Sequence, residues 1–328
     1  MSKTIKQSEN KILHGLHKGR EIANYSEEEL FQVVDYMPEE AERAGYSDYS
    51  YWGCVFQNFM KNKVAVAMLI VFVLVFAFTF IAGKIGNYSY DELKPDNTNI
   101  LMHPSEEHWF GTDNLGRDYW AQVWYAAQTS IKLAAVVAVG EIVLGVIIGL
   151  VWGYVRELDT FFTGLYNIIN NIPVIIYMTL IALLVGRSFM IMAIALIFFG
   201  WLVTARNVRN MVMIYRDREY NLASRCLGTS ILTILYRNIL PYLVSVIIMR
   251  LTLSIPGTIA WESTLSYLGL GLDATTPSLG VLLRNARSYF VDFPYLLIFP
   301  AVIVSLITIT FYLFGNAFAD ASDPRNHV

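Results

Sequence analysis

Six long apolar runs dominate this sequence and limit what it can fold into. A helix that crosses a hydrocarbon core of about 30 Å needs about 20 apolar residues, because each residue adds about 1.5 Å. The runs are continuous rather than alternating, which excludes a membrane β-barrel. In order, they are Val64–Ala82, Thr129–Tyr154, Phe161–Val185, Phe189–Ala205, Ile239–Ile259 and Tyr295–Phe314. Only 16% of the residues are charged, so the sequence predicts an all-α polytopic membrane protein with six transmembrane helices.

The basic residues predict which loops face the cytoplasm. The segment Arg206–Asn238 carries six arginines against two acidic residues, a net charge of +4. The stretch from Asp91 to Asp118 has the opposite bias, with seven acidic residues. We therefore expect Arg206–Asn238 and both termini in the cytoplasm, and the loop Gly83–Gln128 outside.

The first 62 residues form a separate part of the prediction. They are polar and lack an apolar segment, so we expect a cytoplasmic tail without a signal peptide. Ser26 followed by Glu29 has the spacing of a capping box that opens a short helix. The aromatic segment Tyr49–Met60 predicts either an interfacial helix that leads into the membrane or an aromatic belt beside the first span. The expected division is residues 1–62 for the tail with its interfacial helix and 63–328 for the transmembrane domain.

The sequence gives no sign of catalysis or of a bound cofactor. It lacks the GxxxxGK[ST] loop that cradles ATP phosphates. Its five histidines do not have metal-ligand spacing, and Cys54 and Cys226 form neither a disulfide framework nor a metal quartet. A net charge of −3 offers no nucleic-acid footprint. We therefore expect no enzyme activity, no metal and no nucleic-acid partner.

One unusual segment is HWFGTDNLGRD, residues His108–Asp118, which precedes the second span. Its glycines permit tight turns, and its charged residues can pair and lock the loop. The residues of interest are Gly111, Thr112, Asp113, Gly116, Arg117 and Asp118.

A second unusual segment, Glu219–Pro241, lies in the basic cytoplasmic loop and reads EYNLASRCLGTSILTILYRNILP. It combines small residues, a glycine, an apolar face and a proline where the next span begins. A plain connection does not need this pattern, whereas a short amphipathic helix that docks in a groove of another protein does. The expected apolar face consists of Ile231, Ile234 and Leu235.

At these residues the chain resembles the permease subunits of binding-protein-dependent ABC importers, in the oligopeptide/dipeptide/nickel family. The cytoplasmic pattern of that family is Glu-Ala-Ala, three residues, Gly, nine residues, then Ile-x-Leu-Pro. The positions that match in register are Ala223, Gly228, Leu240 and Pro241. The positions that depart from the pattern are Leu222 for the Glu, Ser224 for the second Ala and Asn238 for the Ile.

Further motifs are similar to the OppC/DppC-like permease, the second of the two permeases in such importers. FGTDxLGRD at Phe110–Asp118 is the most diagnostic of them. The others are ESTLSYLGLG at Glu262–Gly271, PSLG at Pro277–Gly280 and DPR at Asp323–Arg325. The resemblance covers roughly residues 50–328.

The resemblance implies a type I ABC importer permease in a bacterial cytoplasmic membrane, with membrane lipid around it. A second permease (OppB/DppB-like) would complete the path, an extracytoplasmic binding protein would deliver oligopeptides or dipeptides, and two ATPase subunits (OppD/OppF-like) would bind ATP and magnesium. The coupling region 216–237 would dock on an ATPase through Glu219, Ala223, Ser224, Gly228, Leu240 and Pro241. Nickel chelates or opine-like solutes are alternative cargoes. A secondary transporter or channel, or a structural subunit of a membrane complex, is a different class that explains the spans without the motifs.

Polar residues inside the spans are candidates for lining a path, because charges there are costly. Glu141 and Arg250 could contact a charged peptide terminus, but an inter-helix pair is favoured. Asn167, Asn170 and Asn171 precede Pro173 and could line a wet path or join helices. Glu262 is expected near the outer end of the fifth span, as a gate element. Gly145, Gly149 and Gly153 are spaced by four, which predicts close approach of a neighbouring helix.

Overall fold

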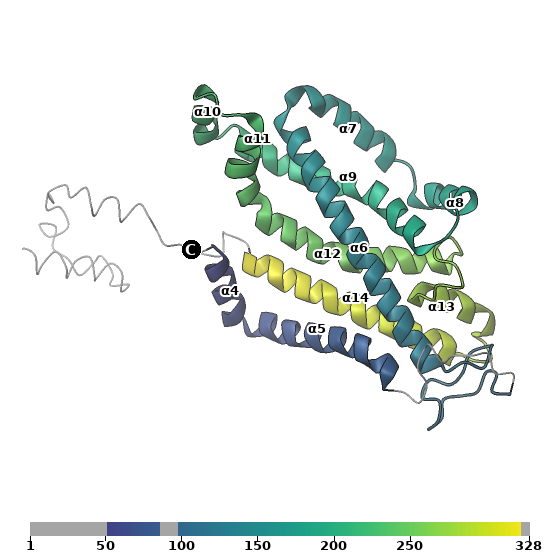
Figure 1. The fold of residues 1–328 in the computed structure, drawn as a ribbon. Coiled ribbons are helices and arrows are strands. Elements are labelled where there is room, and N and C mark those ends of the chain that lie inside the picture. Colours follow the sequence, from purple (N-terminus) through teal and green to yellow (C-terminus); the bar gives the residue numbers. More distant parts are fainter. Residues whose placement is uncertain (1–50, 86–97, 323–328) are drawn as a thin grey trace, which may run out of the picture. The chain divides into compact units, whose positions relative to one another are not determined.

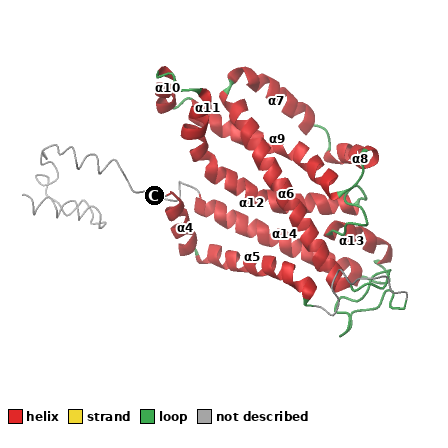
Figure 2. Cartoon of the chain, in the orientation of Figure 1, coloured by secondary structure: helices red, strands yellow, loops and turns green. Residues whose placement is uncertain are grey.

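The computed structural model describes residues 51–85 and 98–322, and most of these are helical (Figures 1 and 2). The first four helices are α4 (Tyr51–Lys61), α5 (Lys63–Ile81), α6 (Tyr119–Tyr154) and α7 (Arg156–Asn170). The next five are α8 (Val174–Leu184), α9 (Phe189–Arg216), α10 (Glu219–Cys226), α11 (Ile231–Thr233) and α12 (Leu240–Tyr267). The last two are α13 (Leu279–Ala286) and α14 (Tyr295–Ser322). Short 3₁₀ turns lie at Ala82–Lys84 and Arg287–Tyr289, and a π-helical segment, Ile234–Ile239, joins α11 to α12.

Side-chain caps define where several of these helices begin. The Asn62 Oδ1 atom accepts hydrogen bonds from the amides of Val64 and Ala65, so α5 starts directly after α4. Asp118 caps α6 by accepting from the amide of Ala121. Such caps satisfy amide groups that a helix leaves without partners in its first turn.

The predicted close approach of a helix to the glycines of the second span is confirmed. A Cβ atom added at Gly145, Gly149 or Gly153 would lie 2.6–2.7 Å from atoms of Thr204, Ala205 or Val212, all in α9. The two backbones are therefore too close for any side chain between them. This stripe fixes α6 against α9 along most of their common length.

The apolar core lies between α6, α12, α13 and α14, with α5 on its edge. Trp124 of α6, Ile259 of α12, Leu279 of α13 and Ile307 of α14 are nearly or fully buried in it. Many other large apolar side chains are exposed, for example Leu184 at 82%. Exposed apolar side chains are normal on helices that face lipid or another membrane subunit.

The structure has four unbroken helices long and apolar enough to span a membrane, and two bent pairs that bring the number to six. The third predicted span, Phe161–Val185, is one of these pairs: α7 and α8 meet at an angle of 78°. Asn171 ends α7, and Pro173 precedes the first turn of α8, where its missing amide hydrogen costs no hydrogen bond. The third apolar run therefore forms a bent pair of helices, with the break directly before Pro173.

The start of the second membrane helix differs from the prediction. Helix α6 begins ten residues before the apolar run, because Tyr119–Gln128 continues the helix into the core. Helix α4 packs on α14, with Phe59 beside Phe314 and Phe318, and the division at residues 62 and 63 stays a prediction. The proposed capping box at Ser26 and Glu29 lies outside the described residues.

Candidate functional site

Helix α10 is an eight-residue helix between α9 and α11 (Figure 1). It ends in a turn at Gly228, whose φ of +76° favours glycine. The amide of Gly228 donates to the carbonyl of Arg225 at 2.9 Å, and the amide of Thr229 donates to the carbonyl of Ser224 at 3.0 Å. These two bonds form a Schellman motif, which terminates a helix sharply. The expected coupling region is thus a short helix, a turn and a second helical segment.

Asparagine side chains connect α10 to the helix that follows it. Asn221 is fully buried; its amide donates to the carbonyl of Tyr215 at 2.9 Å, and its oxygen accepts from Asn238 at 3.0 Å. Asn238 is also 3.3 Å from the hydroxyl of Ser224. The family pattern has Ile where this chain has Asn238. The side chain of Asn238 has hydrogen-bond partners in α10, namely Asn221 and Ser224.

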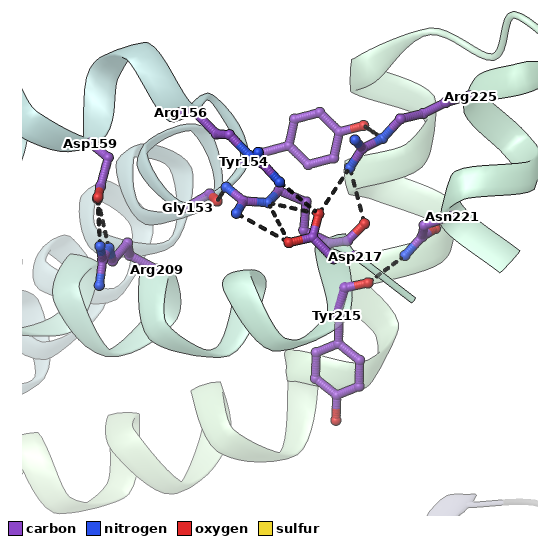
Figure 3. Close-up of polar contacts among 10 residues, drawn as sticks. Gly153, Tyr154, Arg156, Asp159, Arg209, Tyr215, Asp217, Asn221 and Arg225 are labelled. Atoms are coloured by element: carbon purple, nitrogen blue, oxygen red, sulfur yellow. Dashed lines mark hydrogen bonds and ion pairs between the residues drawn. The ribbon is translucent and has the colours of Figure 1, made fainter. Parts of the chain in front are cut away.

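A charged network around Asp217 joins α10 to the ends of α6, α7 and α9 (Figure 3). The Asp217 carboxylate contacts Arg216 at 3.2 Å, Arg156 at 3.4 Å and Arg225 at 4.0 Å. The hydrogen bond from Arg216 is the main cause that lowers the pKa of this carboxyl below its usual value. The other side of the network consists of bonds from Arg216 to the carbonyl of Gly153, at 2.9 Å, and from Arg225 to the hydroxyl of Tyr154, at 3.1 Å. The base of α10 is therefore attached to three other helices.

A second ion pair at the same end joins α7 to α9. Arg209 donates two hydrogen bonds to the carboxylate of Asp159, at 2.7 and 2.8 Å (Figure 3). The indole of Trp152 donates to the same carboxylate at 2.9 Å. Paired geometry of this kind holds two side chains in a fixed orientation.

The outer surface of α10 and α11 is apolar and exposed. Leu227 is 85% exposed and Leu232 is 76% exposed. The other large exposed side chains here are Leu222, Ile231 and Tyr236. The expected apolar face of Ile231, Ile234 and Leu235 is only partly correct, since Ile234 and Leu235 are buried against Val212 and Leu243 of this chain.

The remaining residues of the predicted coupling set lie around this surface. Glu219 begins α10, and Ala223 is exposed on it. Leu240 and Pro241 begin α12, where proline is tolerated because the first turn lacks hydrogen-bond acceptors for its amides. A Cβ atom added at Gly228 would meet no heavy atom within 4 Å. Sequence reasoning missed Asn221, Asp217 and Arg225, although their polar types in an otherwise apolar chain are a usable signal.

The segment His108–Asp118 forms a locked turn at the other end of the molecule. Asp113 accepts two hydrogen bonds from the guanidinium of Arg117, at 2.7 and 2.9 Å, and further bonds from the amides of Leu115 and Arg117. Asp118 pairs with His108 at 3.0 Å, and both are buried. The expectation that charges in this loop pair with each other agrees with these contacts.

Thr112 bonds within this loop, and Tyr295 holds the loop against α14. The Thr112 hydroxyl donates to the carbonyl of Asn99, and the Tyr295 hydroxyl of α14 donates to the carbonyls of Met102 and Thr112. Gly111 has a φ of +76°, and a Cβ atom there would lie 2.3 Å from the carbonyl oxygen of Met102. Gly116 also has a positive φ, of +72°.

Glu262 is fully buried within the chain, and its expected role as a gate element stays a prediction. Its carboxylate accepts hydrogen bonds from the hydroxyls of Ser130, Ser266 and Ser278. Ser278 also caps α13 by accepting from the amide of Val281. This carboxylate therefore joins α6, α12 and α13, and the PSLG motif is the start of α13, a helix that the sequence analysis left within a loop.

A cavity of about 370 Å³ lies among α6, α8, α9, α12 and the break between α7 and α8. Glu141, Asn170 and Arg250 line it, together with aromatic walls from Tyr177, Phe199 and Trp261. The hydroxyl of Ser254 donates to Glu141 at 2.8 Å. No ion pair within 4.0 Å joins Glu141 to Arg250 among the described residues, and the expected inter-helix pairing of each with another subunit stays a prediction.

Asn167 and Asn171 do not line this cavity. The side-chain amide of Asn171 donates to the carbonyl of Asn167 at 2.6 Å, within the last turn of α7. Within the described ranges there is also no cluster of three or more His, Cys, Asp or Glu side chains that could hold a metal ion.

The sequence matches two known families. Residues 141–328 match the family "Binding-protein-dependent transport system inner membrane component", and residues 50–104 match "N-terminal TM domain of oligopeptide transport permease C". The chain belongs to this permease family. It is similar to the oligopeptide transport system permease AmiD of Streptococcus pneumoniae, with 36% identity over 92% of this chain and 98% of the relative.

Two relatives from Bacillus subtilis are similar over nearly the whole chain. The oligopeptide permease OppC is 31% identical over 90% of this chain and 97% of its own, and the dipeptide permease DppC is 31% identical over 92% and 94%. Among solved structures, an inward-facing form of the methionine ABC transporter MetNI contains a chain of similar fold. Its TM-score is 0.51, at 15% identity, over 62% of this chain and 96% of that one. The all-α polytopic permease fold predicted from the sequence is thus confirmed.

Proposed function

We propose that this protein is one of the two permeases of an ATP-driven importer of short peptides in a bacterial cytoplasmic membrane. The relatives named above are oligopeptide and dipeptide transport permeases, which supports peptides as the cargo. An extracytoplasmic binding protein delivers the peptide, a second permease completes the path, and two ATPase subunits bind ATP and magnesium. The work of this chain is to convert movement of those subunits into access from one side or the other.

The observation that carries this proposal is the construction of α10. Arg225 of α10 donates to the hydroxyl of Tyr154 in α6 and to the carbonyl of Arg216 in α9, and Asn221 donates to the carbonyl of Tyr215 in α9. The outer side of α10 presents Leu222 and Leu227 without a partner in the described chain. A short helix with a fixed base and an exposed apolar tip is suited to docking in a groove of another protein. We therefore assign α10 as the helix that an ATPase subunit holds.

Gly228 provides the sharpest test of this assignment. Gly228→Asp and Gly228→Asn add side chains of nearly equal size, and both residues tolerate a positive φ. No heavy atom of the described residues lies within 4 Å of a Cβ atom at this position, and both variants carry the same backbone strain, so a larger loss in Gly228→Asp comes from its charge against a partner. An aspartate buried without a partner against an ATPase costs several kcal/mol in desolvation free energy.

We expect Gly228→Asp to insert in the membrane but to abolish uptake in proteoliposomes that contain the full transporter. Gly228→Asn should retain more assembly and more uptake, and Thr229→Ser should behave as the parent protein. Co-purification of each variant with the ATPase subunits measures assembly directly. Normal assembly and normal uptake in Gly228→Asp would show that α10 does not dock on an ATPase.

The proposed orientation places α10 in the cytoplasm and the His108–Asp118 turn outside. Asn114 and Ser230 are exposed at the two ends, whereas Thr112 is buried and unsuitable for labelling. In a background without Cys54 and Cys226, we expect Asn114→Cys to react with an impermeant thiol reagent in intact cells. Ser230→Cys should react only after the membrane is opened, and the reverse result would overturn the orientation.

The cargo is tested through the partner binding protein. We expect the binding protein that assembles with this permease to retain short peptides when it is purified from cells and its ligands are identified by mass spectrometry. A binding protein that retained only sugars would contradict the peptide assignment while leaving the ATP-driven mechanism in place.

A further inference from the structure

The cavity lined by Glu141 and Arg250 contains an arginine without a partner. Arg250 is in the middle of the apolar run Ile239–Ile259, which is long enough to cross the hydrocarbon core, and therefore lies near the middle of the membrane. It makes no hydrogen bond or ion pair with any residue that the structure describes, and its side chain is only partly exposed. Ionisable side chains at this depth are rare, and they usually pair with another group or face a water-filled cavity.

The break between α7 and α8 lies at the same cavity. Asn170 ends α7, Val174 begins α8, and both line the cavity together with Ile172 between them. Irregular backbone at membrane depth is tolerated only where it is buried in protein or lines a polar space. The first turn of α8 also places the positive end of a helix dipole at the cavity wall. This partial charge has the same sign as the charge of Arg250. Both features favour a negatively charged group in the cavity.

Glu141 places a carboxylate in the same cavity. Its carboxylate is held by Ser254 and does not contact Arg250, so the guanidinium keeps its hydrogen-bond donors free. Two opposite charges in one cavity of low dielectric still attract each other, which stabilises both when the cavity holds only water. A carboxylate that enters can therefore bind Arg250 without first breaking an ion pair.

The size and walls of the cavity suit one end of a peptide. A volume of about 370 Å³ is at the lower end of the range for small-molecule sites. Tyr177, Phe199 and Trp261 supply apolar walls that accept different side chains, while Asn170 supplies an amide for a peptide backbone group. Selectivity for the side chain is low in such a site, whereas the charged terminus is recognised.

We propose that this cavity is a transient subsite for the C-terminal carboxylate of the transported peptide, with Arg250 as its ligand. The inference rests on the proposed function as a peptide permease. Guanidinium groups bind carboxylates through two parallel hydrogen bonds, and a lysine at this position would provide the charge with fewer fixed donors. The subsite holds the peptide between its release from the binding protein and its entry into the cytoplasm.

The test compares uptake of one peptide with a free C-terminus and the same peptide with an amidated C-terminus. The full transporter is reconstituted with its binding protein and ATPase subunits, and uptake is measured for the parent protein, Arg250→Gln and Arg250→Lys. The binding protein is the same in every sample, so its own preference between the peptides cancels when variants are compared. Lys132→Gln is the matched control, because it removes a positive charge from an exposed position of α6 outside the cavity.

We expect Arg250→Gln to lower uptake of the free peptide about tenfold and to leave uptake of the amidated peptide nearly unchanged. Arg250→Lys should recover part of the preference, and Lys132→Gln should not alter it. An equal loss for both peptides, with no recovery by Arg250→Lys, would show a structural role and overturn the subsite. No change for either peptide would also overturn the subsite. If Arg250 binds a lipid phosphate instead, its replacement affects both peptides equally, and that result would overturn the subsite as well. Failure of the parent protein to transport either peptide would overturn the proposed function, and this inference with it.

Discussion

The two ends of this permease are built in opposite ways. At the proposed outer end, charged side chains are buried and bonded within the chain: Asp113 with Arg117, Asp118 with His108, and Glu262 with three serines. At the proposed cytoplasmic end, Asp217, Arg156 and Arg225 are exposed around a buried Arg216, and Leu227 is 85% exposed. The charged groups named at the outer end have partners within the chain, whereas the cytoplasmic end presents exposed charges and apolar side chains that a partner can cover.

The largest expected effect is on Glu262, because its removal breaks the most buried polar contact of the outer end. Glu262→Ala leaves three buried hydroxyls without an acceptor and opens a cavity. We expect the free energy of unfolding to fall by about 3–5 kcal/mol. Thermal unfolding in detergent measures the loss, with the exposed Glu157→Ala as control. Equal stability of the two variants would show that the serine cage is not a structural centre.

Gly111 and Gly228 allow a direct comparison of the two ends, since both have a φ of +76°. Alanine costs about 1–2 kcal/mol in backbone strain at either position. Gly111→Ala adds a clash with the Met102 carbonyl, so we expect a total loss of about 2–4 kcal/mol. In Gly228→Ala the added methyl group has open space, so the free energy of unfolding should fall only by the cost of the backbone strain. Similar thermal unfolding of the two variants would contradict the difference in packing.

Asn221 and Asn238 test the most buried contact of the cytoplasmic end. Loss of either partner leaves a polar group of the other unsatisfied, at about 1–3 kcal/mol. We expect Asn221→Ala and Asn238→Ala to have less than additive effects in the double variant. Denaturant unfolding of the four proteins gives the interaction energy. Strict additivity would mean that the hydrogen bond between them does not stabilise α10.

The smallest expected effect is at Asp217, because exposed ion pairs contribute little, about 0–1 kcal/mol. The pKa of Asp217 is lower in the folded state than in the unfolded state. Its contribution to the free energy of unfolding is therefore present above about pH 4 and is lost as the pH falls through the folded-state pKa. We expect hydrogen exchange in residues 217–228 to be slightly faster in Asp217→Asn than in the parent protein at pH 7. The difference should disappear in acid, and a difference that persists there would exclude a role for the charge.

Much of the fold follows from the sequence because membrane burial leaves long apolar runs. Those runs report only the part of a helix inside hydrocarbon, so they missed the first turns of α6, the break at Pro173 and helix α13. Helix α13 has only eight residues, too few to appear as a membrane span in the apolar pattern. Ser278 before Leu279 is nevertheless a recognisable cap for a helix. Of the candidate sites, Gly228 and the His108–Asp118 turn were found from motifs. The cage around Glu262 was not, because its three serines come from distant positions with no common spacing.

The glycine stripe between α6 and α9 has a consequence for how the cavity around Arg250 changes size. Close backbone packing makes α6 and α9 one rigid body, and Arg225 of α10 joins that body through its hydrogen bonds to the hydroxyl of Tyr154 and the carbonyl of Arg216. A displacement imposed on α10 therefore moves two walls of the cavity together without separating them. The width of the cavity is set by its other walls, which are the α7–α8 break and α12. Movement of these walls relative to α6 and α9 therefore opens or closes the cavity.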